Sequence, residues 1–340
     1  MNATPERFRN ILLATDFSES AATGLETAIS LARQCGAKLT VAHVIRDVSV
    51  SFAMLDYGTA WQALPEDLGR LQNELRDDAE QRLQSLVADH RQTGVEIASQ
   101  VLVGVPYIAL IEAVPQNAFD LVVVGTRGMS AVKRVFVGST ATRLARACPV
   151  PVWIARQGLP GETQSILVPL DFSPIGDRLL ATAAVLAKAL RAKLHLLHVY
   201  DIEELYGVPP ISDDTRAELS YYRRRARRLA LEKLEQSLEA MGLDHGTATL
   251  HVTQGIPHQV INATARKLDV GLILMGSTGR SGLSGLLIGN TAEKVLHTSD
   301  RSLLVVKPEG FAVTLPTKAE VAAEPQLLPV GAASVAHRRW

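Results

Sequence analysis

The sequence repeats itself, and this repeat constrains the fold more than any other feature. The segment NILLATDF at residues 10–17 returns as SILVPLDF at 165–172, and KLTVAHVI at 38–45 returns as KLHLLHVY at 193–200, both after 155 positions. The glycine-rich loops further along the chain recur after 151 positions instead. A repeat of this length indicates two copies of one domain, the second shorter by four residues between its second and third strands.

The repeat predicts the domain boundaries in a chain of 340 residues, which is a length typical of two domains. We expect a first domain at 1–156, a linker at 157–163 and a second domain at 164–308. Residues 309–340 are rich in Ala, Val and Pro and show neither helical nor strand periodicity, so we expect a mostly disordered tail. The alternative is that part of the tail binds back on the domains or on a partner.

Each copy alternates apolar runs of strand length with helical patterns. In the first copy a strand at 11–15 precedes a helix at 20–36, and a strand at 38–45 leads to a long helix at about 66–93. The runs LVVVG and LILMG are continuously apolar, which is typical of parallel strands that are buried on both faces. We therefore predict an α/β protein with two tandem, doubly wound, parallel five-stranded sheets of strand order 3-2-1-4-5. The fold is Rossmann-like, and we expect a pseudo-two-fold arrangement of the two domains.

This strand order predicts where a ligand binds. The topological switch point lies between the first and fourth strands, and ligands bind beyond the carboxyl ends of such strands. Asp16 ends the first strand and Gly125 ends the fourth, while Asp171 and Gly276 hold the same positions in the second copy. We expect each pair to face one crevice, where the aspartate accepts hydrogen bonds from an adenine amino group or a ribose hydroxyl.

A glycine-rich loop follows the fourth strand. In the first copy it has Gly125 and Gly128 separated by two residues, then nine residues, then Gly138, Ser139 and Thr140. Glycines let the backbone approach a ligand closely. Ser139 is a candidate N-cap of the helix that follows, and the free N–H groups of a helix N-terminus suit a phosphate.

Positive charge surrounds this loop, from Arg127, Lys133 and Arg134. The alternative interpretation is a pair of structural turns and an ordinary helix cap. The loop is not a P-loop, because GxxxxGK[ST] is absent, and the segment TDFSES after the first strand excludes the GxGxxG fingerprint.

Taken together, these motifs resemble the universal stress protein family in its tandem form, with two domains of the UspA type. TDFS and LDFS after the first strand, HV at the end of the second, G-x-P before the third helix and Gly-x2-Gly-x9-Gly all occur twice and in order, over residues 7–308. The second copy is similar to the C-terminal half of enteric UspE-type tandem proteins. The resemblance implies an adenine nucleotide alpha hydrolase-like fold.

The resemblance also implies an ATP site, with or without Mg²⁺, in each copy. In the first copy the implied residues are Asp16, Val44, Val124, Gly125, Arg127, Gly128, Gly138, Ser139 and Thr140. In the second copy they are Asp171, Val199, Met275, Gly276, Gly279, Gly289, Asn290 and Thr291. Asn290 departs from the usual Ser or Thr, so the surroundings of the phosphates differ and we expect the first copy to be the better site.

Three functions follow as hypotheses. The first is a cytoplasmic, ATP-binding stress-response regulator whose nucleotide state sets its interactions. The second is a scaffold or a carrier of a small molecule or lipid, with degenerate nucleotide sites. The third is an adenylating enzyme, and the absence of an SGGxDS-type loop after the first strand argues against it. No nucleophile, base and orienting group in the sequence form a recognisable catalytic set. Slow ATP hydrolysis is the most that the resemblance implies.

Charge and composition restrict the partners. The formal net charge is zero, which argues against a protein that coats nucleic acid. No secretory signal and no apolar run long enough to span a bilayer is present, so we expect a cytoplasmic protein with no transmembrane segment. Adenine nucleotide, pairing of the two domains and a homodimer are the expected interactions.

The remaining features have structural and functional interpretations. Cys35 and Cys148 are expected to be buried, reduced thiols. His43 and His198 occupy equivalent strand positions, where a structural histidine is favoured over one that stacks on a ligand. The arginines at 223–228 indicate either a surface for nucleic acid, anionic lipid or an acidic partner, or a solvated helix face paired with Glu218, Glu232 and Glu235.

Overall fold

The structure is a computed structural model that describes residues 7–48, 65–126, 137–156, 165–200, 213–242, 246–277, 288–311 and 315. The first half contains β1 (Asn10–Thr15), α1 (Glu19–Cys35), β2 (Lys38–Ile45), α3 (Pro65–Asp89), the 3-10 helix η2 (Arg91–Thr93), β3 (Ile97–Val103), α4 (Pro106–Gln116), β4 (Leu121–Gly125), α5 (Ser139–Ala147) and β5 (Val152–Ala155). The second half contains β6 (Ser165–Pro169), α6 (Gly176–Leu190), β7 (Lys193–Tyr200), α8 (Asp213–Ala240), β8 (Ala248–Gln254), α9 (Pro257–Lys267), β9 (Leu272–Gly276), α10 (Asn290–Thr298) and β10 (Ser302–Val306).

The strand order in each half confirms the predicted topology, but the two sheets are joined. The order is β3-β2-β1-β4-β5-β10-β9-β6-β7-β8, so each half reads 3-2-1-4-5 from its outer edge inward. The halves meet where β5 pairs antiparallel with β10. The prediction of two separate five-stranded sheets is therefore replaced by one ten-stranded sheet. The reason is that every residue of β5 and β10 is buried, and an apolar edge strand left open would invite pairing with another chain.

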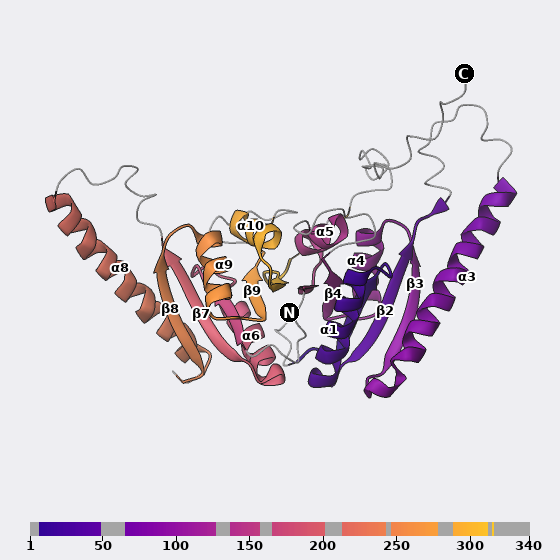
Figure 1. The fold of residues 1–340 in the computed structure, drawn as a ribbon, viewed down its shortest axis with the longest axis horizontal. Coiled ribbons are helices and arrows are strands. Elements are labelled where there is room, and N and C mark those ends of the chain that lie inside the picture. Colours follow the sequence, from indigo (N-terminus) through magenta and orange to yellow (C-terminus); the bar gives the residue numbers. More distant parts are fainter. Residues whose placement is uncertain are drawn as a thin grey trace, which may run out of the picture.

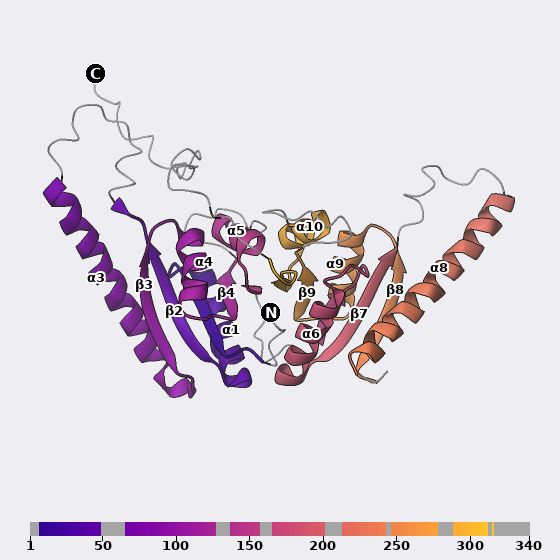
Figure 2. The ribbon, with the colours of Figure 1, turned by 180° about the vertical axis from the view of Figure 1, so that it is seen from behind.

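Helices cover both faces of this sheet. On one face, buried residues of α1, α3, α6 and α8 form a single core that includes Leu31 and Leu83 from the first half and Leu190 and Leu234 from the second. On the other face, α4, α5, α9 and α10 form a second core, which also draws on both halves. Figures 1 and 2 show the two halves meeting at the centre of a crescent, with α3 and α8 at its opposite ends. No described helix is long and apolar enough to cross a membrane.

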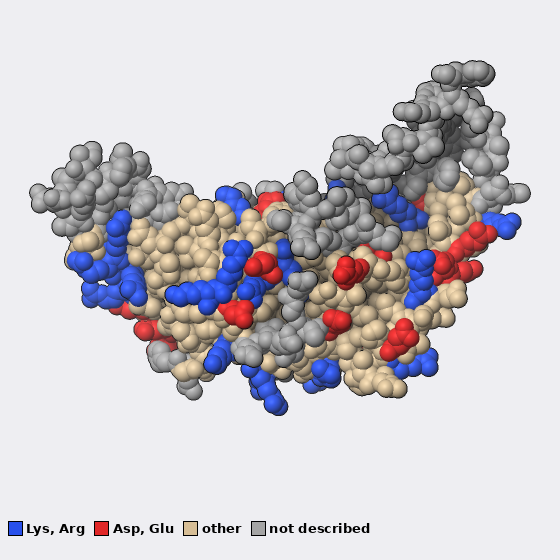
Figure 3. Space-filling view, viewed as in Figure 1, with Lys and Arg blue, Asp and Glu red and all other residues tan. Residues whose placement is uncertain are grey.

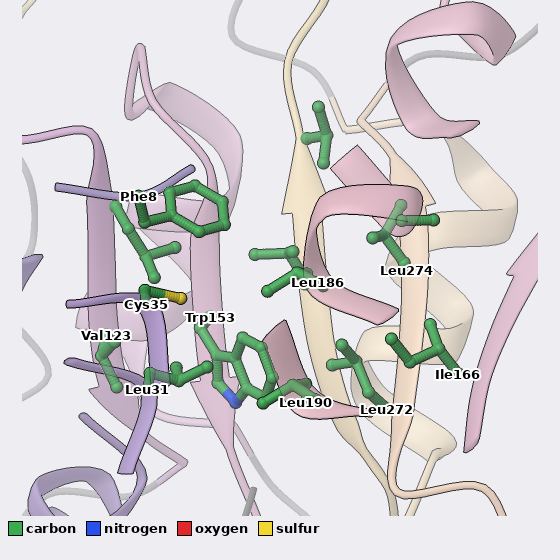
Figure 4. Packing of buried hydrophobic residues seen from close by; sticks show 14 of the residues in the cluster. Phe8, Leu31, Cys35, Val123, Trp153, Ile166, Leu186, Leu190, Leu272 and Leu274 are labelled. Carbon is green, nitrogen blue, oxygen red and sulfur yellow. The ribbon is translucent and has the colours of Figure 1, made fainter. Parts of the chain in front are cut away.

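Trp153 of β5 lies at the junction of the halves. It pairs in register with Leu304 of β10 and is 1% exposed. Figure 4 shows its ring between Leu31 of α1 and Leu190 of α6, and α1 also contacts α6 directly. Its indole nitrogen is buried and finds no hydrogen-bond partner in the described part of the chain. The junction is thus a packed apolar core.

Two cations cross the junction in a reciprocal manner. Lys307, which follows β10, is fully buried and its Nζ donates to the carbonyls of Ala145 and Arg146, 2.5 and 2.7 Å away, at the C-terminal end of α5. Arg156, which follows β5, donates from Nη2 to the carbonyl of Leu296 in α10 at 2.6 Å. Each cation meets the negative end of a helix dipole in the opposite half, so each half caps the C-terminal end of a helix in the other half.

We predict that Lys307 makes stability rise with pH between about pH 7 and 9. Burial lowers the pKa of its amine to about 7, against an ordinary value of 10.5, and the neighbouring Cys148 opposes this only partly. Over this window the unfolded chain binds more protons than the folded one, so the free energy of unfolding increases by up to about 1.4 kcal/mol per pH unit.

Urea unfolding at several pH values measures this slope, and Lys307→Met should remove it. Above about pH 8 the buried Cys35 and Cys148 thiols, whose pKa values burial raises to about 11 and about 12, work in the opposite direction, so the variant and the wild type are compared below that pH. An identical slope in the variant would show that Lys307 is not the group responsible.

The sequence also predicted the state of the two cysteines, a linker and a disordered tail. Cys35 and Cys148 are free and buried, as predicted. Residues 157–164 and 316–340 fall outside the described residues, so the linker and most of the tail are not tested. At the start of the tail, the Phe311 ring lies 4.9 Å from Nζ of Lys307 and Leu315 packs against the second core, which agrees with the alternative that part of it contacts the domains.

Candidate functional site

The strand register brings the predicted residues of the first copy to one edge of the sheet. Thr15 of β1 pairs with His43 of β2, and Ala14 pairs with Val124 of β4. Asp16, Val44 and Gly125 therefore lie at the carboxyl ends of three adjacent parallel strands. This is the edge at which the topological switch point predicts a ligand.

Asp16 organises the turn between β1 and α1. Its Oδ1 accepts hydrogen bonds from the backbone N–H of Ser18 at 3.1 Å and from the Ser18 hydroxyl at 2.6 Å. Ser18 in turn caps α1, because its hydroxyl accepts from the N–H of Ala21 at 3.3 Å. The side chain serves the fold whether or not a ligand is bound.

Phe17 and His43 complete this turn and were not predicted as site residues. Phe17 has φ of 60°, a left-handed conformation that is unusual for a bulky residue. Its ring lies 4.6 Å from that of His43, whose Nδ1 is 2.8 Å from the carbonyl oxygen of Thr15. A carbonyl only accepts, so Nδ1 carries the proton. The structure thus supports the structural interpretation of this histidine, and the recurrence of Phe and His in both copies was the available signal.

The second copy builds the same turn with the equivalent residues. Asp171 Oδ1 accepts from the N–H and hydroxyl of Ser173, and Phe172 again has φ of 60°. The Phe172 and His198 rings are 4.4 Å apart, and His198 Nδ1 is 2.7 Å from the carbonyl oxygen of Leu170. Because two copies with different neighbours keep this geometry, the motif that led to the nucleotide prediction has a folding role of its own.

Gly125 is a glycine because of the fold. A Cβ at this position would lie 2.4 Å from the carbonyl oxygen of Ser20 and 3.2 Å from the N of Ala21, both in the first turn of α1. This contact gives the glycine a structural role, and its predicted role of making room for a ligand stays a prediction. The result is that the N-terminal end of α1 lies directly against the end of β4.

The N-terminus of α5 lies next to this edge and differs from the prediction in one respect. The cap residue is Gly138, with φ of −61° and ψ of 154°, and no side chain caps the helix. Ser139 is the first helical residue rather than the cap. Gly138 itself donates its N–H to the carbonyl of Thr126 just beyond β4, at 2.6 Å, which holds the helix end at the sheet edge. Ser139 is exposed and Thr140 half-buried, and the first turn contains no acidic residue.

The second copy has a similar helix end with a different charge. Gly289 caps α10 and donates to the carbonyl of Ser277 at 2.7 Å, while Asn290 is the first helical residue and not the cap. Glu293 lies in the first turn of α10, where α5 has Thr142, and it pairs with Arg146 of α5. A carboxylate at a helix N-terminus opposes the binding of an anion there, although Arg146 offsets part of its charge.

The remaining predicted residues are divided between the described and undescribed parts of the chain. Val199, at the end of β7, Met275 and Gly276, at the end of β9, and Thr291, in the first turn of α10, occupy positions equivalent to those in the first copy. Arg127, Gly128 and Gly279, with the basic Lys133 and Arg134, fall outside the described residues. Within the described ranges, no group of three His, Cys, Asp or Glu side chains could hold a metal ion.

Comparison with known proteins agrees with the resemblance. A model described as the universal stress protein family matches residues 7–156 and 162–307. Universal stress protein E of Photorhabdus laumondii is 23% identical over 314 residues, covering 89% of this chain and 96% of that protein. The universal stress protein E homolog of Haemophilus influenzae is 26% identical over 318 residues, covering 89% of this chain and 98% of that protein.

A solved structure shows the same fold. The crystal structure of a universal stress protein from Archaeoglobus fulgidus matches with a TM-score of 0.60 and 22% sequence identity. The match covers 88% of this chain and 98% of that chain. The likeness therefore extends over both halves and includes their arrangement in tandem.

Proposed function

The chain belongs to the universal stress protein family, and we propose that it acts in the stress response by binding an adenine nucleotide, ATP, in its first half. The observation that carries the proposal is the N-terminus of α5. Gly138 begins this helix without a side-chain cap or an acidic first turn, and it lies at the same sheet edge as Asp16. Helix N–H groups and the positive end of the dipole suit phosphate oxygens.

Each residue of the first half has a role in this proposal. Asp16 accepts a hydrogen bond from the ribose or the adenine amino group, and Val44 and Val124 line the nucleoside with backbone and apolar atoms. Ser139 and Thr140 donate N–H and hydroxyl hydrogen bonds to the phosphates. Since the described residues offer no cluster of metal ligands, Mg²⁺ would be held chiefly by phosphate oxygens and water, as is usual for this ion.

We propose that the protein binds its ligand without converting it at an appreciable rate. Among the described residues, Asp16 is bonded within its own turn and His43 donates to a carbonyl, so neither is arranged as a base for an attacking water. We therefore propose at most slow ATP hydrolysis. We also propose a cytoplasmic location, which agrees with two free, buried cysteines.

A second function is proposed for the second half, because the charge at its helix end differs. Glu293 and Asn290 give α10 a poorer phosphate site than α5. We propose that this half binds nucleotide weakly and serves as a scaffold, or as a carrier for a ligand without phosphate. Mass spectrometry of the protein as purified distinguishes the two, because a carrier would retain a compound other than a nucleotide.

The substitution Thr142→Glu tests the nucleotide site. It gives α5 the carboxylate that α10 carries at the equivalent position, so a helix of the same type already accommodates it. Two like charges about 6 Å apart at an effective dielectric constant of about 40 repel by about 1.4 kcal/mol, so we expect ATP affinity to fall about tenfold. Isothermal titration of the wild type and the variant measures the change.

Two control variants make the result specific. Thr142→Val removes the hydroxyl without adding charge and should leave the affinity near that of the wild type. Glu293→Gln removes the carboxylate from α10 and releases Arg146 of α5 from its ion pair, which adds no negative charge to α5 and should not weaken the first site. ATP binding of equal strength in Thr142→Glu would exclude α5 as the phosphate site.

A further inference from the structure

The two end helices of the crescent, α3 and α8, correspond residue by residue at a spacing of 151. Ala79 and Leu83 of α3 are buried, as are Ala230 and Leu234 of α8. One residue before each leucine, a cation lies over the phenylalanine of the turn motif: Arg82 is 5.7 Å from the Phe17 ring and Lys233 is 5.2 Å from the Phe172 ring. The exposed faces of the two helices can therefore be compared position by position.

The charges on these exposed faces are inverted. Glu74 of α3 corresponds to Arg225 of α8, and Asp77 corresponds to Arg228. All four side chains are exposed. Figure 3 shows Lys and Arg gathered at the α8 end of the molecule, whereas the α3 end shows Asp and Glu together with several basic side chains. Equivalent surface positions in two copies of one domain thus carry opposite charge.

The same faces also expose large apolar side chains. Leu71 of α3 is 39% exposed and its equivalent, Tyr222 of α8, is 43% exposed. Leu75 lies one turn further along α3, at 41%, and Leu229 lies two turns along α8, at 51%. Exposed apolar side chains therefore lie near Glu74 and Asp77 on α3 and near Arg225 and Arg228 on α8, and such a surface suits a contact between helices. The acidic side chains of α3 alternate with arginines, which pair with them within the helix.

The local charge partners do not account for the arginines. The predicted pairing with Glu232 or Glu235 is not found for Arg225 and Arg228, which form no ion pair with any residue whose side chain the structure describes. The side chain of Glu218 falls outside the described part, so that pairing is not tested. On α3, Glu74 pairs with Arg70 of its own helix at 2.9 Å, with both side chains largely exposed. Exposed pairs within a helix contribute little, so Glu74 can exchange its partner at small cost.

We propose that α8 of one molecule binds α3 of a second copy of this chain. The two helices of one molecule lie at opposite ends of the crescent and cannot meet (Figures 1 and 2). Contact between two α3 helices or two α8 helices would place like charges together. Contact between α8 and the partner's α3 pairs Arg225 and Arg228 with Glu74 and Asp77, and the exposed apolar side chains cover one another. This inference is independent of the nucleotide proposal.

Charge reversal at the two helices tests the contact. The all-acidic variant carries Arg225→Glu and Arg228→Asp, and the all-basic variant carries Glu74→Arg and Asp77→Arg. We expect wild-type protein to associate with increasing concentration in sedimentation velocity at low salt. We expect it to dissociate at 0.5 M salt, because the Debye length there is about 4 Å, against about 10 Å at 0.1 M, and the charge pairs are screened. Each variant alone should remain monomeric, because the four substituted or opposing positions 74, 77, 225 and 228 then carry charges of one sign.

Mixing the two variants gives the decisive result. In an equimolar mixture the acidic α8 of one variant faces the basic α3 of the other, and the acidic α3 faces the Arg-rich α8. We expect association to return to the wild-type level, which misfolded variants could not produce. Arg33→Glu, an exposed helix position in α1, is the matched control and should associate like the wild type.

Three outcomes would overturn the proposal. The first is a wild type that stays monomeric at all concentrations, and the second is a mixture that stays apart although each variant has a wild-type circular dichroism spectrum. The third is association that persists in the all-acidic variant alone. Binding of a fluorescent single-stranded RNA by monomeric wild type, lost in the all-acidic variant, would assign the arginines to nucleic acid instead.

Discussion

Gly125→Ala should destabilise the protein by ~3 kcal/mol or more, although it adds a single methyl group. The new Cβ would lie 2.4 Å from the carbonyl oxygen of Ser20 and 2.8 Å from its carbonyl carbon, closer than such atoms approach. Both are backbone atoms in the first turn of α1, so no side-chain rotation relieves the overlap. Overpacking of a well-packed core costs about 1–3 kcal/mol, and a backbone clash belongs at or above the upper end.

Gly69→Ala is the matched control for this prediction. Gly69 lies inside α3, and a Cβ there meets nothing within 4 Å. Alanine in a helix interior is favoured over glycine by about 1 kcal/mol, so this variant should be slightly more stable than the wild type. Urea unfolding followed by circular dichroism compares the two. Equal stability of Gly125→Ala and the wild type would show that α1 does not lie against β4 as described.

Trp153→Ala should cost about 3–5 kcal/mol, the usual loss for a large buried aromatic. The ring fills the junction between the halves, where it packs between Leu31 and Leu190 (Figure 4). Because both cores draw on both halves, we expect the wild type to unfold in one calorimetric transition. Removal of the ring weakens the contact between the two halves, and it should therefore broaden or split that unfolding transition.

Trp153→Phe separates loss of packing from loss of the indole. Phenylalanine keeps most of the apolar ring and removes a buried N–H that has no partner among the described residues. The lost contacts and the removed unsatisfied donor act in opposite directions, so this variant should lose much less stability than Trp153→Ala. Two well-separated transitions in the wild type would contradict the shared core.

The order of strands and helices could be predicted because local patterns determine it. Continuous apolar runs such as LVVVG identified parallel strands, and the repeat provided each element twice. The joining of the sheets through β5 and β10 could not be read in the same way, because it pairs residues about 150 positions apart. The reciprocal contacts of Lys307 and Arg156 were missed for the same reason, since a lysine after a strand has no local pattern that indicates burial.

The strand order predicted which residues meet at one sheet edge, while the binding roles of these residues stay predictions. Asp16, Val44 and Gly125 do lie at one sheet edge, as the strand order required. Gly125 also accommodates α1, and Gly138, not Ser139, caps α5. Glycine and aspartate are frequent in both turns and ligand sites, so sequence alone could not separate these uses.

The adenine nucleotide site in the first half is the central proposal, and the stoichiometry of ATP binding tests it most directly. Isothermal titration of the full chain, freed of any nucleotide retained in purification, should give one well-resolved site per chain. The same titration of Thr142→Glu should show that site weakened about tenfold. No saturable binding, or one site per chain that Thr142→Glu leaves unchanged, would contradict the account.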